Sequence, residues 1–135
     1  MRLLTRLFEP RTVAYAHCDL PCGVYDPAQA RIEAESVRAI AEKYQQNTDH
    51  DYRTRCLIIK EQRSELVKHH LWVLWTDYFK PPHFEKYPQL HTLFNEATKL
   101  AGAGGTKGSV DVGTADELLG KIEEISKIFW ETKQG

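Results

Sequence analysis

The chain lacks any hydrophobic run long enough to cross a membrane, and it lacks an excess of charge of either sign. Its 135 residues carry a formal net charge of -1. A transmembrane helix needs about 20 consecutive apolar residues, and no segment approaches that length. A near-neutral balance also provides no strongly basic surface of the kind that binds nucleic acid or anionic membranes. We therefore expect neither nucleic acid nor a membrane as a partner.

Cysteine is scarce as well. The chain has three, an odd number, in Cys18, Cys22 and Cys56. Small secreted domains that depend on disulfides carry dense and usually even sets of cysteines. The sequence therefore does not predict a disulfide framework. A reducing compartment suits this composition better, and we expect a cytoplasmic protein.

The first sixteen residues differ from the rest. Arg2, Arg6 and Arg11 stand against a single acid, Glu9. Polar residues interrupt the leucines, whereas a secretory signal has a continuous apolar core. The Ala-Tyr-Ala sequence at positions 14–16 resembles a processing site. We expect residues 1–16 to be a leader that is removed on maturation, and residues 17–135 to form one domain.

Four stretches carry apolar residues every three or four positions, which is the pattern of amphipathic helices. The first begins at Asp26-Pro27, where Asp26 can cap a helix and Pro27 suits its first turn. The others are expected over about 52–78, over about 88–101 and from Thr114 onward. Pro81 and Pro82 are expected to end the second helix.

These helices predict an all-α fold, because no segment alternates with the period of a strand. Four amphipathic helices with mostly short connections favour an antiparallel four-helix bundle. The segment before the first helix is expected to add an N-terminal metal-binding hook. The expected core positions, in chain order, are Ala30, Ala34, Val37, Ala41, Tyr44, Cys56, Ile59, Arg63, Leu66, Val67, His70, Val73, Leu74, Leu90, Leu93, Phe94, Ala97, Leu100, Leu118, Ile122, Ile125 and Phe129.

The densest set of metal donors is the segment His-Cys-Asp-Leu-Pro-Cys-Gly at residues 17–23. A structural zinc site or an iron–sulfur cluster needs about four ligands, and no second cluster accompanies this one. A thioredoxin-like site would have the spacing Cys-x-x-Cys. The spacing alone leaves open a Cys18–Cys22 disulfide, two thiols in a turn, or a metal hook.

The metal hook depends on a cut after Ala16, which would make His17 the N-terminus. The His17 amine, the Cys18 amide nitrogen and the sulfurs of Cys18 and Cys22 could then surround one ion. Two nitrogens and two thiolates suit a square-planar ion such as nickel(II) or copper(II). The His17 imidazole could approach that ion as an axial ligand.

Residues 17–27 resemble the nickel hook of the nickel-containing superoxide dismutases. The resemblance covers most of residues 17–135 and includes the runs 28–36, 59–63, 75–88 and 128–132. It implies a superoxide dismutase that produces dioxygen and hydrogen peroxide by cycling nickel between the +2 and +3 states. It also implies one nickel ion per subunit, a homohexamer of four-helix bundles, and a dedicated peptidase that removes the leader.

The same resemblance assigns the metal ligands. It implies that nickel is bound by the amine and imidazole of His17, by the amide and sulfur of Cys18, and by the sulfur of Cys22. In this assignment the hook spans residues 17–25.

Further residues receive roles around that hook. Tyr25 is expected beside the open axial face, where it restricts access to small anions. Glu33 is expected to orient the His17 imidazole, and Arg63 to anchor the Glu33 carboxylate. Asp19 is expected to act through its backbone amide on superoxide or on the thiolates.

Two other functions remain open. The bundle could carry nickel or copper for delivery or storage, or it could be a thiol switch that uses a Cys18–Cys22 disulfide. Elsewhere, Cys56 is expected to be a buried small apolar residue, and the histidines to fill core or interface positions. The aromatic residues of 72–87 are expected to serve packing. Lys80 and Lys86 are expected either to attract an anion or to be solvated charges.

Overall fold

The computed structural model describes residues 22–135, and all regular structure in that range is helical. None of the helices in this range is both long and apolar enough to cross a lipid bilayer. The elements, in chain order, are α2 (Ala28–Gln45), α3 (His50–Val73), the π-helix η1 (Leu74–Tyr78), α4 (Pro81–Lys86), α5 (Leu90–Leu100) and α6 (Val112–Gln134).

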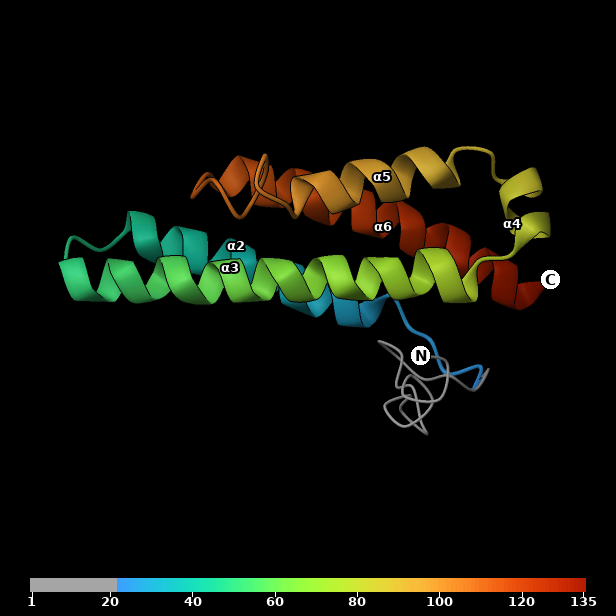
Figure 1. Ribbon diagram of the computed structural model, residues 1–135, viewed down its shortest axis with the longest axis horizontal. Helices are drawn as coiled ribbons and strands as arrows, with labels where there is room; N and C mark the ends of the chain where they lie inside the picture. The colour runs from blue at the N-terminus through green and yellow to red at the C-terminus, as the bar shows by residue number, and fades with distance from the viewer. Residues whose placement is uncertain (1–21) are drawn as a thin grey trace, which may run out of the picture.

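The four long helices form an antiparallel bundle (Figure 1). Helix α3 packs against α2 and α5, and α6 packs against the same two helices. Consecutive long helices are therefore neighbours and alternate in direction, which is the arrangement that short connections favour. This result confirms the predicted fold class.

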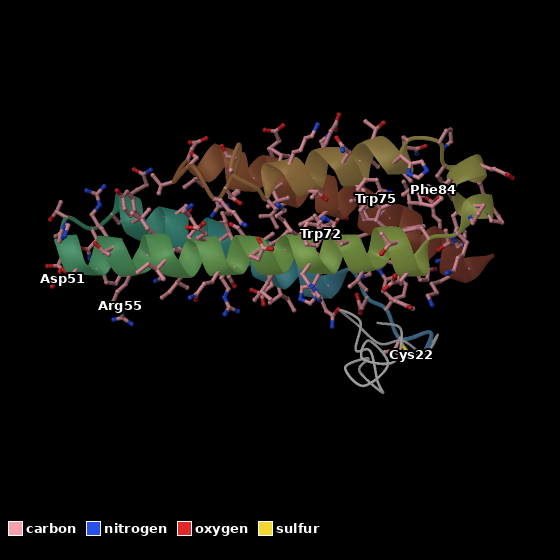
Figure 2. All side chains as sticks on the ribbon, viewed as in Figure 1. Cys22, Asp51, Arg55, Trp72, Trp75 and Phe84 are labelled. Atoms are coloured by element: carbon pink, nitrogen blue, oxygen red, sulfur yellow. The ribbon has the colours of Figure 1, made fainter. Side chains whose placement is uncertain are left out.

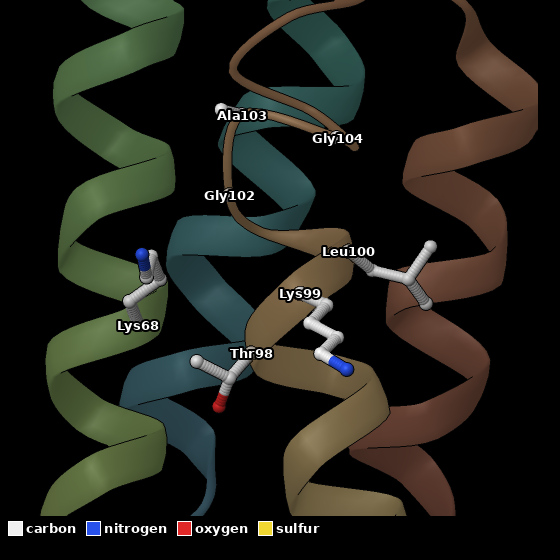
Figure 3. Close-up of a pocket in the computed structure, with 7 residues that line it drawn as sticks. All are labelled: Lys68, Thr98, Lys99, Leu100, Gly102, Ala103 and Gly104. Carbon is white, nitrogen blue, oxygen red and sulfur yellow. The ribbon is translucent and has the colours of Figure 1, made fainter.

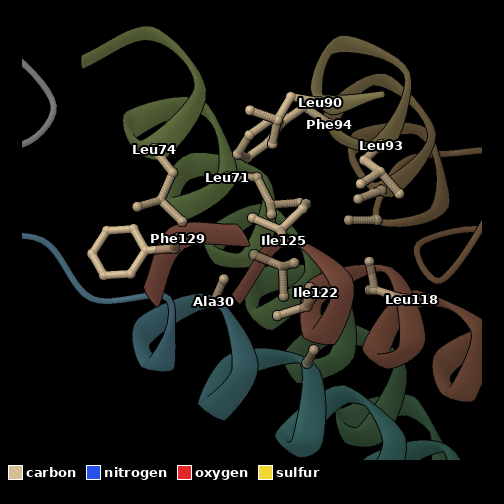
Figure 4. Packing of buried hydrophobic residues seen from close by; sticks show 14 of the residues in the cluster. Ala30, Leu71, Leu74, Leu90, Leu93, Phe94, Leu118, Ile122, Ile125 and Phe129 are labelled. Atoms are coloured by element: carbon tan, nitrogen blue, oxygen red, sulfur yellow. The ribbon is translucent and has the colours of Figure 1, made fainter. Parts of the chain in front are cut away.

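Large apolar side chains from α3, α5 and α6 fill the interior (Figure 4). Phe94 and Phe129 are completely buried, as are the alanines at 34 and 97. The small side chains of Ala30 and Ala34 let α2 approach this layer closely. Burial of each large apolar side chain contributes about 1.5–3 kcal/mol. The expected core positions on the first, third and fourth helices are confirmed, except that Tyr44 and Leu100 are only half-buried.

The predicted buried face of the second helix was wrong in part. The side chain of Ile59 is exposed, whereas Lys60 and Ser64 are buried. The Lys60 ammonium donates hydrogen bonds to the carbonyl oxygens of Thr106 and Lys107. The Ser64 and Thr106 hydroxyls lie 2.8 Å apart in another hydrogen bond. Two buried polar residues thus occupy the core-facing stripe, and an apolar pattern cannot reveal them.

Several helix ends also differ from the prediction. The second helix does extend to Tyr78, but its last five residues are a π-helix, in which the Phe79 N–H donates to the Leu74 carbonyl at 3.0 Å. Pro81 begins the short helix α4, since proline is tolerated in a first turn. Helix α6 begins at Val112, because the Asp111 carboxylate accepts the N–H of Thr114 at 3.1 Å and caps the helix.

Candidate functional site

The predicted metal ligands divide between two parts of the chain. His17 and Cys18 lie outside the described residues, as does Asp19. Cys22 is the first residue that the structure describes, and its side chain is exposed. Figure 2 shows Cys22 outside the bundle, on the segment that leads into α2. Any metal bound through Cys22 therefore lies at the surface of the bundle.

The turn after Cys22 brings backbone groups to its sulfur. The Val24 N–H donates to the Cys22 sulfur at a distance of 3.4 Å. Gly23 adopts a φ of 72°, in the left-handed region that glycine enters without strain. The Cys22 sulfur also lies 4.0 Å from the Val24 carbonyl oxygen, to which a thiol can donate. The thiolate is the form of cysteine that binds metals. Cys22 therefore fits the role of a soft ligand to a transition metal.

Tyr25 anchors the end of this segment to the bundle. Its half-buried side chain packs against the hydrophobic core, with its ring centroid 5.5 Å from that of Tyr78. Tyr78 lies in η1, and its ring centroid is 4.4 Å from that of Phe129 in α6. The Tyr78 hydroxyl is hydrogen-bonded to the Thr132 hydroxyl at 2.6 Å. The chain that leads out of the hook is thus fixed by side chains from η1 and from the C-terminal part of α6.

The sequence predicts only a packing role for Tyr78, shared with the other aromatic residues of 72–87. Its contact with Tyr25 joins two positions far apart in the chain, so no local spacing could reveal it. The π-helix that carries Tyr78 left no readable signal either. Wide turns of this type occur frequently at functional sites.

Glu33 and Arg63 form an ion pair between α2 and α3. The Arg63 Nη1 atom donates to both carboxylate oxygens of Glu33, at 3.1 and 3.3 Å. The Glu33 side chain is only 17% exposed, so the pair is less screened than a surface pair. Glu33 lies five residues after Ala28, about 7.5 Å along the axis of α2 from the end that the hook enters. A carboxylate held in this way still has lone pairs to accept another donor.

Two histidines in the described range accept hydrogen bonds within the bundle. The His91 Nδ1 atom accepts the indole N–H of Trp75 at 3.0 Å. The His83 Nδ1 atom accepts the backbone N–H of Lys80 at 3.0 Å. Within residues 22–135 the structure shows no group of three or more histidine, cysteine or acidic side chains that could hold a metal ion.

A cavity of about 420 Å³ lies at the C-terminal end of α5 (Figure 3). Its lining includes Lys68, Lys99 and the loop glycines, but no thiol, imidazole or carboxylate. The carbonyl oxygens of Thr98 and Lys99 lie beside Gly102 on this side. This lining therefore does not supply the ligands of a redox metal.

Comparison with known proteins identifies close relatives. The family model for nickel-containing superoxide dismutase matches residues 12–133. "Superoxide dismutase [Ni]" of Streptomyces seoulensis is 62% identical over 132 residues, which cover 98% of this chain and 99% of that protein. The native nickel superoxide dismutase structure aligns with a TM-score of 0.85 and 62% identity, over 88% of this chain and 100% of that one. A structure with nickel ligation corresponding to the oxidized state gives the same TM-score and coverage at 64% identity.

Proposed function

Because this chain belongs to the nickel-containing superoxide dismutase family, we propose that it converts two superoxide ions and two protons into dioxygen and hydrogen peroxide. The observation that carries the proposal is the 62% identity over nearly the whole chain. The exposed Cys22 sulfur supports it independently because it places a soft donor atom at the predicted hook.

We assign the nickel ligands to His17, Cys18 and Cys22, as the family resemblance implies. When bound, nickel supplies one-electron chemistry by alternating between the +2 and +3 states. A Cys22 thiolate bound to the ion would keep the Val24 N–H as a hydrogen-bond donor.

The surrounding side chains orient this site and limit access to it. Arg63 holds the Glu33 carboxylate, which in the proposed site accepts the N–H of the His17 imidazole and fixes the ring. Tyr25 borders the approach to the hook, where its ring excludes molecules larger than small anions. Tyr78 restricts the movement of Tyr25 because their rings are in contact.

We further propose that a peptidase removes residues 1–16 and that the mature chain begins at His17. The relative from Streptomyces seoulensis aligns over 98% of this chain, whereas the native solved structure, aligned over 100% of its own length, covers only 88% of this chain. The difference is about the length of the proposed leader. An uncut chain has an amide in place of the His17 amine, and an amide nitrogen is a much poorer ligand unless it is deprotonated.

The proposal includes the assembly of the subunits and the location of the protein in the cell. We propose a homohexamer, for which the exposed apolar side chains of Ile32, Ile58 and Trp130 are candidate contacts. The scarcity of cysteine supports a cytoplasmic location.

The proposal is tested by comparing two nickel-treated forms, the chain that begins at His17 and the full chain. We expect the cut form to bind one nickel per subunit and to remove superoxide rapidly, and the full chain to remain inactive. Superoxide decay after pulse radiolysis and metal analysis provide the measurements.

Two results would contradict the proposal. A cut form that binds nickel without dismutase activity would indicate a metal carrier. A native protein without nickel whose mass is lower by two hydrogens would indicate a Cys18–Cys22 thiol switch. Equal activity of the two forms would disprove only the requirement for a free amine at His17 and would leave the dismutase function in place.

A further inference from the structure

The short helix α4 carries a histidine whose ring lies against Tyr78. The ring centroids of His83 and Tyr78 are 5.8 Å apart and the ring planes differ by only 10°, so the two rings are stacked. The ring of His83 also meets that of Phe79 at a right angle, with the centroids 5.7 Å apart. Phe79 belongs to the core and is only 3% exposed. His83 therefore contacts both a core residue and the tyrosine that packs against Tyr25.

One hydrogen bond fixes the protonation state of this ring. The His83 Nδ1 atom accepts the backbone N–H of Lys80 at 3.0 Å. A ring nitrogen accepts a hydrogen bond only when it carries no proton, so this contact requires a neutral imidazole with its proton on Nε2. In the imidazolium form both ring nitrogens are donors, and the hydrogen bond from Lys80 is lost. The bond that holds the His83 ring in its stacked position is therefore available only in the neutral form.

The stacked contact sets the orientation of the Tyr78 ring. The Tyr78 hydroxyl is hydrogen-bonded to the Thr132 hydroxyl at 2.6 Å. That oxygen lies on the axis about which the ring rotates, so the hydrogen bond leaves the ring plane free. Contacts with the ring faces fix the plane. The contact with His83 is nearly parallel, whereas the rings of Phe129 and Tyr25 are tilted by 40° and 58°.

We propose that neutral His83 is a positioning residue for the dismutase site, which holds the Tyr78 ring in the plane that packs against Tyr25 and releases that ring when the imidazole is protonated. The inference rests on the proposed function, because Tyr25 is expected to border the approach to the hook. A misplacement of about 1 Å by a distant substitution can lower a rate about 100-fold. A displacement that is passed through two rings should have a smaller effect.

The other titratable side chains near His83 come from three parts of the chain. They are Asp77 and Tyr78 on η1, Lys80, Glu85 and Lys86 on α4 and its N-cap, and Lys133 on α6, whose ammonium is 5.1 Å from the Tyr78 ring centroid. Histidine is the only one of these side-chain types that ordinarily changes its charge between about pH 5 and 8. A pH dependence in this range that disappears when His83 is replaced therefore reports the imidazole.

The test measures the second-order rate constant for superoxide decay, per bound nickel in the mature protein, by pulse radiolysis from about pH 5.5 to about pH 8. We expect His83→Leu to lower the rate constant about three- to tenfold at pH 8. At pH 5.5 the wild type has lost the same contact, so the two proteins should converge. His91→Leu is the matched control, because the His91 Nδ1 atom also accepts an N–H, but its ring stacks on Phe84 rather than on Tyr78. It should match the wild type at every pH.

Two further variants keep the test decisive if His83→Leu does not fold. His83→Phe retains a ring against Tyr78 but cannot be protonated, so its rate constant should stay within about twofold of the wild type at pH 8 and exceed it at pH 5.5. In Tyr78→Leu the stacked contact is already absent. Adding His83→Leu to Tyr78→Leu should therefore cause no further loss, because the effects of residues that act through one shared contact are not additive.

Three results would overturn the inference. An unchanged rate of His83→Leu at pH 8 would show that the stacked ring has no influence on the site. A loss of equal size at every pH would show that His83 acts through packing in either protonation state, and a further loss in the double variant would show that it does not act through Tyr78. In each case the wild type is active, so the proposed function stands. An inactive nickel-loaded wild type would instead refute that function and this inference with it.

Discussion

The two ends of the bundle are held together by different kinds of interaction. Where the hook joins, Tyr25, Tyr78 and Phe129 make ring contacts, and the segment outside them is exposed, with Val24 73% accessible. Toward the other end, the loop between α5 and α6 is fastened to α3 by Lys60 and its hydrogen bonds. Lys60 and Thr106 are each only 2% exposed.

This difference predicts that substitutions at the hook change activity, whereas substitutions at the loop change stability. The hook offers donor atoms on a short segment that buries little surface, so its substitution should alter activity with little effect on folding. The loop contains no group assigned to the reaction, but it leaves buried polar atoms that require partners. Its substitution should alter folding with little effect on the chemistry of a folded molecule.

The largest effect is expected for Cys22→Ser. A hydroxyl does not replace the thiolate as a soft ligand, so nickel-dependent activity should fall to the background of the uncatalysed reaction. The free energy of unfolding of the metal-free protein should change by no more than about 0.5 kcal/mol, because the side chain is exposed. Metal analysis, superoxide decay and urea unfolding provide the measurements.

The matched control is Cys56→Ala, which removes a thiol that is buried in α3. This variant should lose some stability and keep full activity per folded molecule. Retention of nickel and activity by Cys22→Ser would disprove the assignment of Cys22 as a ligand.

A smaller effect is expected when the interhelical ion pair is broken by Arg63→Met. Glu33 would keep its half-buried position but lose the donor that fixes its carboxylate. Removal of a partner that orients a metal ligand typically lowers affinity or activity by about 10–100-fold. We expect a loss of activity in this range at unchanged nickel content, measured at saturating metal.

Arg31→Met is the control for that variant. It breaks an exposed ion pair with Glu35 on the same helix α2, where the two side chains are 45% and 53% accessible. Exposed pairs contribute at most about 1 kcal/mol, so the activity should not change. Equal losses in the two variants would show that the effect of Arg63 is not specific to Glu33.

The sequence predicted the bundle because apolar residues mark three of its four helices without ambiguity. Leu118, Ile122, Ile125 and Phe129 recur at helical spacing, and all four are buried. On α3 the same rule held only in part, since Lys60 and Ser64 face inward and satisfy their polar atoms on a distant loop. Such a face is defined by tertiary hydrogen bonds, and the periodicity of one helix does not contain them.

The candidate site, like the bundle, was predictable only in part. The donor cluster of residues 17–23 is a local feature, and it was evident from the sequence. The pairing of Glu33 with Arg63 was expected from the family resemblance, and the structure brings the two side chains together. The contacts of Tyr78 with Tyr25 and Lys133 depend on the register of η1 and the end of α6, which only the folded chain determines.

The smallest effect on activity is expected for Lys60→Met, which alters the contact between α3 and the loop that joins α5 to α6. The variant keeps an unbranched side chain, one atom shorter, but leaves the carbonyl oxygens of Thr106 and Lys107 without their donor. An unpartnered buried acceptor costs about 1–3 kcal/mol, so the free energy of unfolding should fall by about that amount. Lys99→Met, an exposed control at the end of α5, should change it by less than about 0.5 kcal/mol.

The pH dependence provides a sharper measurement of the same contact. Burial lowers the pKa of Lys60 below its usual 10.5, despite an opposing effect of Glu61. Between the lowered pKa and about 10.5 the unfolded chain binds more protons than the folded one, so this group makes the folded state more stable as the pH rises. Lys60→Met lacks this contribution. The stability difference between wild type and variant should therefore be smallest below the lowered pKa and widen toward pH 10.5. Urea unfolding at several pH values measures this difference, and parallel pH profiles of the two proteins would show that the Lys60 ammonium is not desolvated by the loop.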